Sequence, residues 1–77
     1  MFNVYRVSNP NYSIDGQDAK VLVVTTDEEK AVLLGSAKMQ EFSEVLDFWD
    51  PALLKCELIV EDVDDVDEDY STNVILK

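Results

Sequence analysis

The chain has 77 residues, and its 17 Asp and Glu against six Lys and Arg give a formal net charge of −11 at pH 7. This charge repels DNA, RNA and anionic membrane surfaces, and it attracts cations and basic protein surfaces. The apolar content of 47% is ordinary for a folded protein, so we expect residues 1–77 to form a single small domain.

The composition also narrows the chemistry. The chain has no His, which removes the usual acid/base group at neutral pH and the commonest transition-metal ligand. Its single cysteine, Cys56, excludes an intramolecular disulfide. We find no phosphate-binding loop, nucleophile elbow, signal peptide or long apolar run. We therefore expect a cytoplasmic protein that is not an enzyme and has no cofactor or metal.

The residue pattern of the N-terminal part of the chain predicts two strands. Residues 2–7 are rich in β-formers. Residues 8–18 contain the turn formers Asn9-Pro10-Asn11 and Asp15-Gly16, which predict a long loop between the two strands of a hairpin. Residues 20–25 form an aliphatic run that predicts a central strand, covered on one face by a helix and on the other by a partner or loop.

Two helical patterns follow. Thr26 and Glu29 have capping-box spacing, so the first helix is predicted to begin at Thr26 and to end or bend at Gly35-Ser36. Residues 38–49 show a second pattern with an apolar and an acidic face. Its apolar face consists of Met39, Phe42, Leu46 and Trp49. Its acidic face consists of Glu41, Glu44 and Asp47.

The C-terminal part predicts two more strands. Asp50-Pro51 has the residues of the cap and first position of a short helical turn. Residues 54–61 alternate and predict a strand whose core face carries Leu54, Cys56, Leu58 and Val60. Residues 71–76 predict a short last strand. The order ββαββ predicts an α+β fold: an antiparallel sheet of about four strands with one or two helices packed on one face.

Two candidate sites are weak. Asp65, Asp67 and Asp69 have the spacing that opens an EF-hand loop, but Tyr70 and Leu76 stand where that loop needs Gly and Glu. We therefore do not expect a specific calcium site. Cys56 lies on an apolar strand face among acids that raise a thiol pKa, which favours a buried structural thiol over a reactive one.

Residues 61–69, called the acidic run below, contain seven acids and no basic residue. One interpretation is a solvated loop that keeps a small domain soluble, pinned as a turn or short helix by Val60, Val63 and Val66. The other is mimicry of nucleic acid. An extended chain advances about 3.3 Å per residue, close to the spacing of about 3.4 Å between charges on one DNA strand.

The mimicry hypothesis assigns a partner-binding surface. The acidic run contributes Glu61, Asp62, Asp64, Asp65, Asp67, Glu68 and Asp69. The second helical pattern contributes Glu41, Glu44 and Asp47, and the field is extended by Asp15, Asp18 and Asp50. Tyr70 and Trp49, where exposed, would supply the aromatic anchors typical of interfaces. The helical spacing of Trp49 favours a core position for that side chain.

Three segments carry a resemblance to known proteins: the strand-helix unit at 20–31, Trp49-Asp50-Pro51 before the strand at 54–59, and the apolar strand at 73–76. This layout resembles that of small phage and prophage proteins of unknown function. The resemblance implies a mobile-element origin, and it transfers no functional residues. By charge and size the chain is also similar to anti-CRISPR and anti-restriction proteins that mimic DNA.

The leading hypothesis is therefore a non-enzymatic inhibitor that binds the basic groove of a host defence nuclease or another DNA- or RNA-binding protein. The alternative is a small interaction or structural module whose acids serve solubility, and which associates through a free sheet edge or uncovered apolar residues. Neither hypothesis expects direct binding to nucleic acid or membrane. A homodimer stays open under both.

Overall fold

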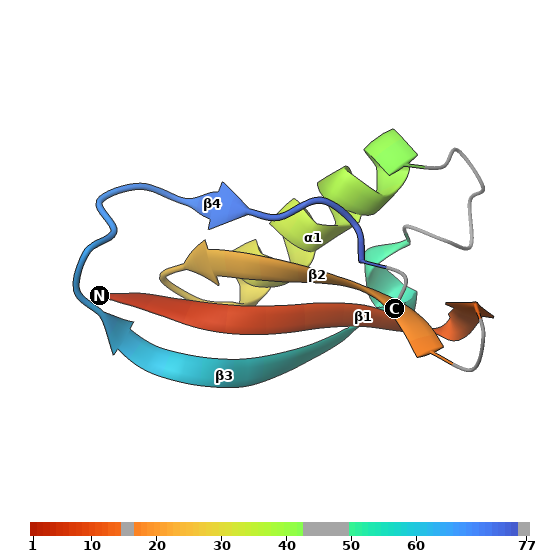
Figure 1. The fold of residues 1–77 in the computed structure, drawn as a ribbon, viewed down its shortest axis with the longest axis horizontal. Helices are drawn as coiled ribbons and strands as arrows, with labels where there is room; N and C mark the ends of the chain where they lie inside the picture. The colour runs from red at the N-terminus through yellow and green to blue at the C-terminus, as the bar shows by residue number, and fades with distance from the viewer. Residues whose placement is uncertain (15–16, 43–49, 76–77) are drawn as a thin grey trace.

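The computed structural model describes the backbone of residues 1–14, 17–42 and 50–75 (Figure 1). Its elements are β1 (Phe2–Ile14), β2 (Gln17–Thr25), α1 (Glu28–Phe42), the 3-10 turn η1 (Pro51–Leu53), β3 (Lys55–Val63) and β4 (Tyr70–Ser71). The strands form one antiparallel sheet in the order β3-β1-β2-β4, and α1 packs on one face of it. The predicted α+β class and the ββαββ order are confirmed.

The hairpin of β1 and β2 is longer than predicted. Pairing runs from Asn3 opposite Thr25 to Ile14 opposite Gln17, with a register shift between Asn9 and Ser13. The prediction of a loop over residues 8–18 is therefore wrong. The irregularity lets β1 pass Pro10, which has no N–H to donate, without leaving the sheet.

The core lies between α1 and the sheet. Alternate residues of β1 and β2 point at the helix and are buried, namely Tyr5, Val7, Asn9, Ala19, Val21, Val23 and Thr25. This confirms residues 20–25 as part of a central strand covered on one face by a helix. The core cluster consists of Tyr5, Val7, Ala19, Val21, Val23, Ala31 and Met39. Burial of each large aliphatic side chain contributes about 1.5–3 kcal/mol, so this layer accounts for most of the fold's stability.

Helix α1 runs without a break through Gly35 and Ser36, so the predicted end or bend there is wrong. A Cβ on Gly35 would lie 2.8 Å from the Cβ of Val7, which means that glycine lets the helix approach β1 closely. The N-terminal cap is Asp27, whose Oδ1 accepts a 2.8 Å hydrogen bond from the Lys30 N–H, and not the predicted Thr26. Residues 43–49 of the second helical pattern lie outside the described residues.

The C-terminal part confirms one local prediction and shortens another. The Asp50 carboxylate accepts a 3.0 Å hydrogen bond from the Ala52 N–H, so it caps η1 with Pro51 in first position. Strand β4 has only two residues, and beyond it Ile75 forms a separate bridge with Lys20. Within the described ranges, no helix is long and apolar enough to cross a bilayer.

Edge strand β3 departs from the predicted alternation. Leu54 and Cys56 pack against the core as expected, but Leu58 and Val60 are 45% and 48% exposed. The register against β1 shifts beside Ile59, so Val60 lies opposite Val4, on the face away from the helix. The prediction of one continuous core face is therefore wrong. The bulge turns Val60 outward, whereas Leu58 lies opposite Tyr5 on the face toward the helix and is exposed at the edge of the sheet.

Candidate interaction surface

The acidic run begins on β3 and then crosses one end of the sheet to reach β4 at the opposite edge (Figure 1). All seven of its carboxylate residues are exposed. The two valines within it, Val63 and Val66, are half-buried, but Val63 belongs to β3 and the run forms bends and no short helix. Val60, the third residue of that pattern, is exposed and does not contribute.

Three further contacts hold the run in place. Val63 pairs with Phe2, and the Asp62 N–H donates a 3.1 Å hydrogen bond to the Asn3 side-chain oxygen. At the other end, the hydroxyl of buried Thr25 donates a 2.9 Å hydrogen bond to the Asp69 carboxylate. The run is therefore a built part of the domain, tied to both central strands of the sheet.

The path of the run differs from the extended chain assumed for mimicry. Asp62 has a φ of 57°, and the backbone bends at Asp64, Asp65 and Glu68. A match to the linear charge spacing of a DNA strand therefore does not follow from the chain's rise per residue. The negative field comes instead from carboxylates folded around one end of the sheet, with no basic residue in the run.

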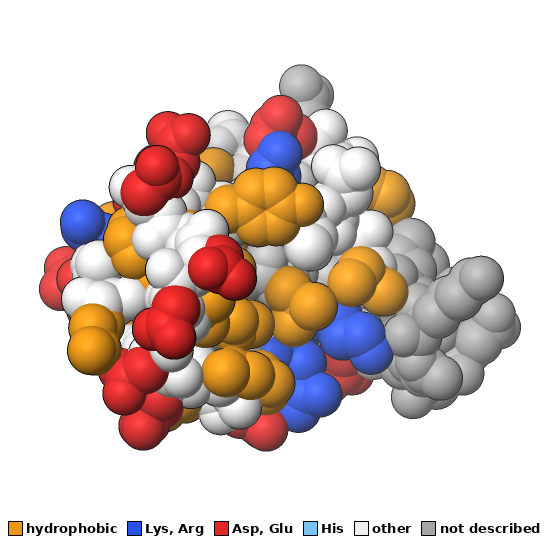
Figure 2. Space-filling view, turned by 60° about the vertical axis from the view of Figure 1, so that its left-hand side comes forward, with side chains coloured by type: hydrophobic (Ala, Val, Ile, Leu, Met, Phe, Trp, Pro, Cys, Tyr) orange, Lys and Arg blue, Asp and Glu red, His pale blue; other side chains and the backbone are white. Residues whose placement is uncertain are grey.

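A second group of acids lies at the start of α1, where the sequence predicted only that they stabilise the first turn of a helix. Asp27, Glu28 and Glu29 follow directly after the end of β2, where Thr25 holds Asp69. The antiparallel hairpin brings this chain reversal to the same end of the sheet as the acidic run. Figure 2 shows acidic side chains gathered toward its left-hand side, which is the consequence of this arrangement.

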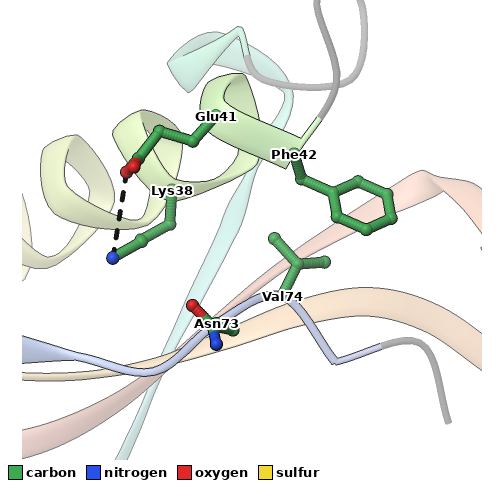
Figure 3. Close-up of a pocket in the computed structure, with 5 residues that line it drawn as sticks. All are labelled: Lys38, Glu41, Phe42, Asn73 and Val74. Atoms are coloured by element: carbon green, nitrogen blue, oxygen red, sulfur yellow. Dashed lines mark ion pairs between the residues drawn. The ribbon is translucent and has the colours of Figure 1, made fainter.

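Glu41, the one described acid of the second helical pattern, does not extend this surface. Glu41 lies in the last turn of α1, where its carboxylate is 3.8 Å from the Lys38 amine, beside Asn73 and Val74 (Figure 3). That turn lies at the other end of the molecule from the acidic run (Figure 1). Asp18 and Asp50 also lie away from the run, in a hollow with Lys20 and at the η1 cap. The remaining predicted residues, Asp15, Glu44, Asp47 and Trp49, lie outside the described residues.

The sequence left the exposure of Tyr70 open and predicted a buried thiol at Cys56. Tyr70 follows the acidic run directly and is 61% exposed, which the anchor role requires. Cys56 is half-buried, and burial together with the nearby Glu28 carboxylate raises its pKa from 9.0 to about 11. A thiol with this pKa stays protonated at neutral pH, so it is a poor nucleophile. Among the described residues, no three His, Cys, Asp or Glu side chains are arranged so that they could hold a metal ion.

No protein-family model, curated protein or solved structure matches this chain. Its function is therefore inferred from the charge, exposure and geometry of its own residues.

Proposed function

We propose that the chain is a non-enzymatic inhibitor, encoded by a phage or another mobile element, that binds the basic groove of a host nuclease or other nucleic-acid-binding protein. The observation that carries this proposal is the acidic run. Its seven exposed carboxylates are held on a folded support next to the exposed ring of Tyr70. A groove built to bind phosphates attracts such a surface, and opposite charge accelerates the encounter.

The contacts that anchor the acidic run also lower the entropic cost of binding a partner. A loop that becomes ordered only when it binds loses conformational freedom, and this weakens the association. The Thr25–Asp69 hydrogen bond, the Asn3–Asp62 hydrogen bond and the two half-buried valines order the backbone of this run before any partner arrives. Tyr70 adds an aromatic side chain of the kind that dominates interface energetics.

The test is a pull-down from bacterial lysate at low salt, followed by a DNA-competition assay on each captured protein. The variant replaces three acids of the run, Asp64, Asp65 and Asp67, by Asn. The control removes the same number of charges elsewhere, through Asp18→Asn, Glu41→Gln and Glu57→Gln. We expect a nucleic-acid-binding protein on the native and control baits only, released by salt and displaced by DNA. Equal capture by the run variant overturns the proposal.

The alternative module is favoured by a different observation. Leu58, Ile59 and Val60 are consecutive, each 45–48% exposed, and lie on edge strand β3. Exposed apolar residues on a sheet edge are typical of association surfaces. If Ile59→Thr abolishes capture of a partner and the triple Asn variant does not, the module is the better description.

A further inference from the structure

The face of the sheet opposite α1 carries an ordered charge pattern. We call it the open face, because no described element lies over it. The strand pairing sorts its side chains into three rows across the sheet. The first row is apolar and consists of Val60, Val4, Val24 and Tyr70. The second consists of Glu57, Arg6 and Leu22. The third consists of Lys55, Ser8 and Lys20.

Cations are concentrated on this face. Arg6, Lys20 and Lys55 are three of the six basic residues in the chain, and they line one shallow hollow with Ser8, Asp18 and Glu57. Arg6 is held there by a 2.7 Å ion pair with Glu57. The acidic run lies beyond the opposite side of the apolar row, next to the pairing of Phe2 with Val63. Figure 2 shows this order: acidic side chains, then hydrophobic ones, then Lys and Arg.

The cations and the acidic run lie on opposite sides of the apolar row. The Lys55–Lys20 row lies four β1 residues from Val4, which is about 13 Å along a strand. In the other direction, Phe2 lies two residues from Val4 and pairs with Val63, and the acidic run continues from there across the end of the sheet. A two-fold rotation about an axis along the apolar row therefore exchanges the positions of opposite charges.

We propose that the open face binds a second copy of this chain. The two sheets pack face to face about 10 Å apart, as in other sheet-on-sheet interfaces. The two-fold axis runs along the apolar row, so the apolar rows meet and each Lys55–Lys20 row faces the partner's acidic run. A two-fold axis parallel to the strands would instead place each Lys55–Lys20 row opposite the same row of the partner. Repulsion between like charges disfavours that arrangement. Because interface and charges belong to one patch, the contact is isologous and closes as a dimer.

This proposal is independent of the inhibitor function, since it is measured on the pure protein. The two surfaces share the acidic run, however, so a basic target competes with the second copy for the same carboxylates. The apolar row contributes only four side chains to the contact, which is few for a stable interface. We therefore expect an association that is detected at high micromolar concentration. At 0.15 M salt the Debye length is about 8 Å, so charges in contact dominate over the net repulsion between two acidic copies.

The experiment is charge-swap complementation, followed by sedimentation equilibrium from about 1 µM to about 1 mM. One variant carries Lys20→Glu and Lys55→Glu, and the other carries Asp64→Lys and Asp65→Lys. We expect each variant alone to be monomeric, with at least tenfold weaker association than wild type. An equimolar mixture restores the dimer, because each swapped row then faces an opposite charge.

The control carries Lys30→Glu and Lys38→Glu, which make the same charge change on helix α1, away from the open face. It is expected to retain most of the wild-type association, and circular dichroism checks that every variant is folded. The proposal is overturned by a monomeric wild type over the whole range. It is equally overturned when the helix control dissociates as much as the Lys20/Lys55 variant, or when the mixture of folded variants stays monomeric.

Discussion

Replacement of Gly35 by Ala tests the contact on which the helix-sheet packing depends. Gly35 is buried in the middle of α1, and an added Cβ would lie 2.8 Å from both Cβ and Cγ1 of Val7 and 3.1 Å from Cγ2. Carbon atoms of this kind pack at about 3.5–4.0 Å. The helix therefore has to move away from β1 by a few tenths of an ångström or more, and this loosens the core on both sides of the contact.

Two opposing terms set the size of the effect. Alanine is favoured over glycine inside a helix by about 1 kcal/mol, whereas overpacking of a core costs about 1–3 kcal/mol. Rotation of the Val7 side chain can move Cγ1 and Cγ2 away from the new methyl group, but it cannot move the Val7 Cβ, which is bonded to the backbone. The upper part of the overpacking range therefore applies. We expect a net loss of about 1–2 kcal/mol in the free energy of unfolding. The whole free energy of unfolding of a domain of this length is about 4–12 kcal/mol.

Urea unfolding followed by circular dichroism measures this loss, with Ala37→Gly as the reference. Ala37 is exposed on α1, so its replacement reports the helix propensity term alone, about 1 kcal/mol. The double variant Gly35→Ala/Val7→Ala removes Cγ1 and Cγ2 and is expected to cost less than the sum of the two single changes. A Gly35→Ala variant that is more stable than wild type refutes the close approach of α1 to β1.

Two other predictions concern the acidic run and the thiol. Thr25→Val removes the hydroxyl that holds Asp69 and is expected to cost about 1 kcal/mol, near the low end for a bond to a charged acceptor that water can reach. Cleavage of the run by a glutamate-specific protease should accelerate in this variant and not in Asp69→Asn, which keeps an acceptor; equal rates contradict the anchoring. Alkylation of Cys56 at pH 8 should be about a hundredfold slower than for a thiol of pKa 9.0, since the thiolate fraction falls by that factor. Glu28→Gln should lower the pKa and speed the reaction, whereas an unchanged rate, or an equal effect of Glu29→Gln, argues against the Glu28 contribution. Because the folded pKa is raised, this thiol favours the fold below pH 9, and that contribution is lost as the pH rises toward 11.

The predictions that succeeded depended on neighbours in the chain. Asp50 and Pro51 stand next to each other in the sequence, and the cap they form with Ala52 spans three residues. The aliphatic run at 20–25 has the composition of a central strand whatever surrounds it, and the structure places it between β1 and β4. The apolar face of the strand was enough to indicate a raised pKa for Cys56, because burial is the main cause, but the acid that contributes is Glu28 on α1 and not a neighbour in the chain.

Apart from the helix cap, where Asp27 takes the place of its neighbour Thr26, the predictions that failed depended on residues far apart. Gly35 was expected to end a helix because glycine commonly does so, but its contact with Val7, 28 positions earlier, makes it an interior packing position. Val60 was assigned to the core by alternation, and the bulge against β1 turned it outward. Pro10 was assigned to a loop, although the sheet accommodates it through a register shift.

The sequence by itself determined the charge, the α+β class and the location of the acids along the chain, because composition and short-range periodicity are properties of consecutive residues. Only the tertiary structure decided that the acidic run is tied down by Thr25 and Asn3, that Glu41 lies apart from it, and that three cations meet on the open face. Antiparallel pairing sets these neighbours, and its register depends on bulges and on helix packing, which no local pattern encodes.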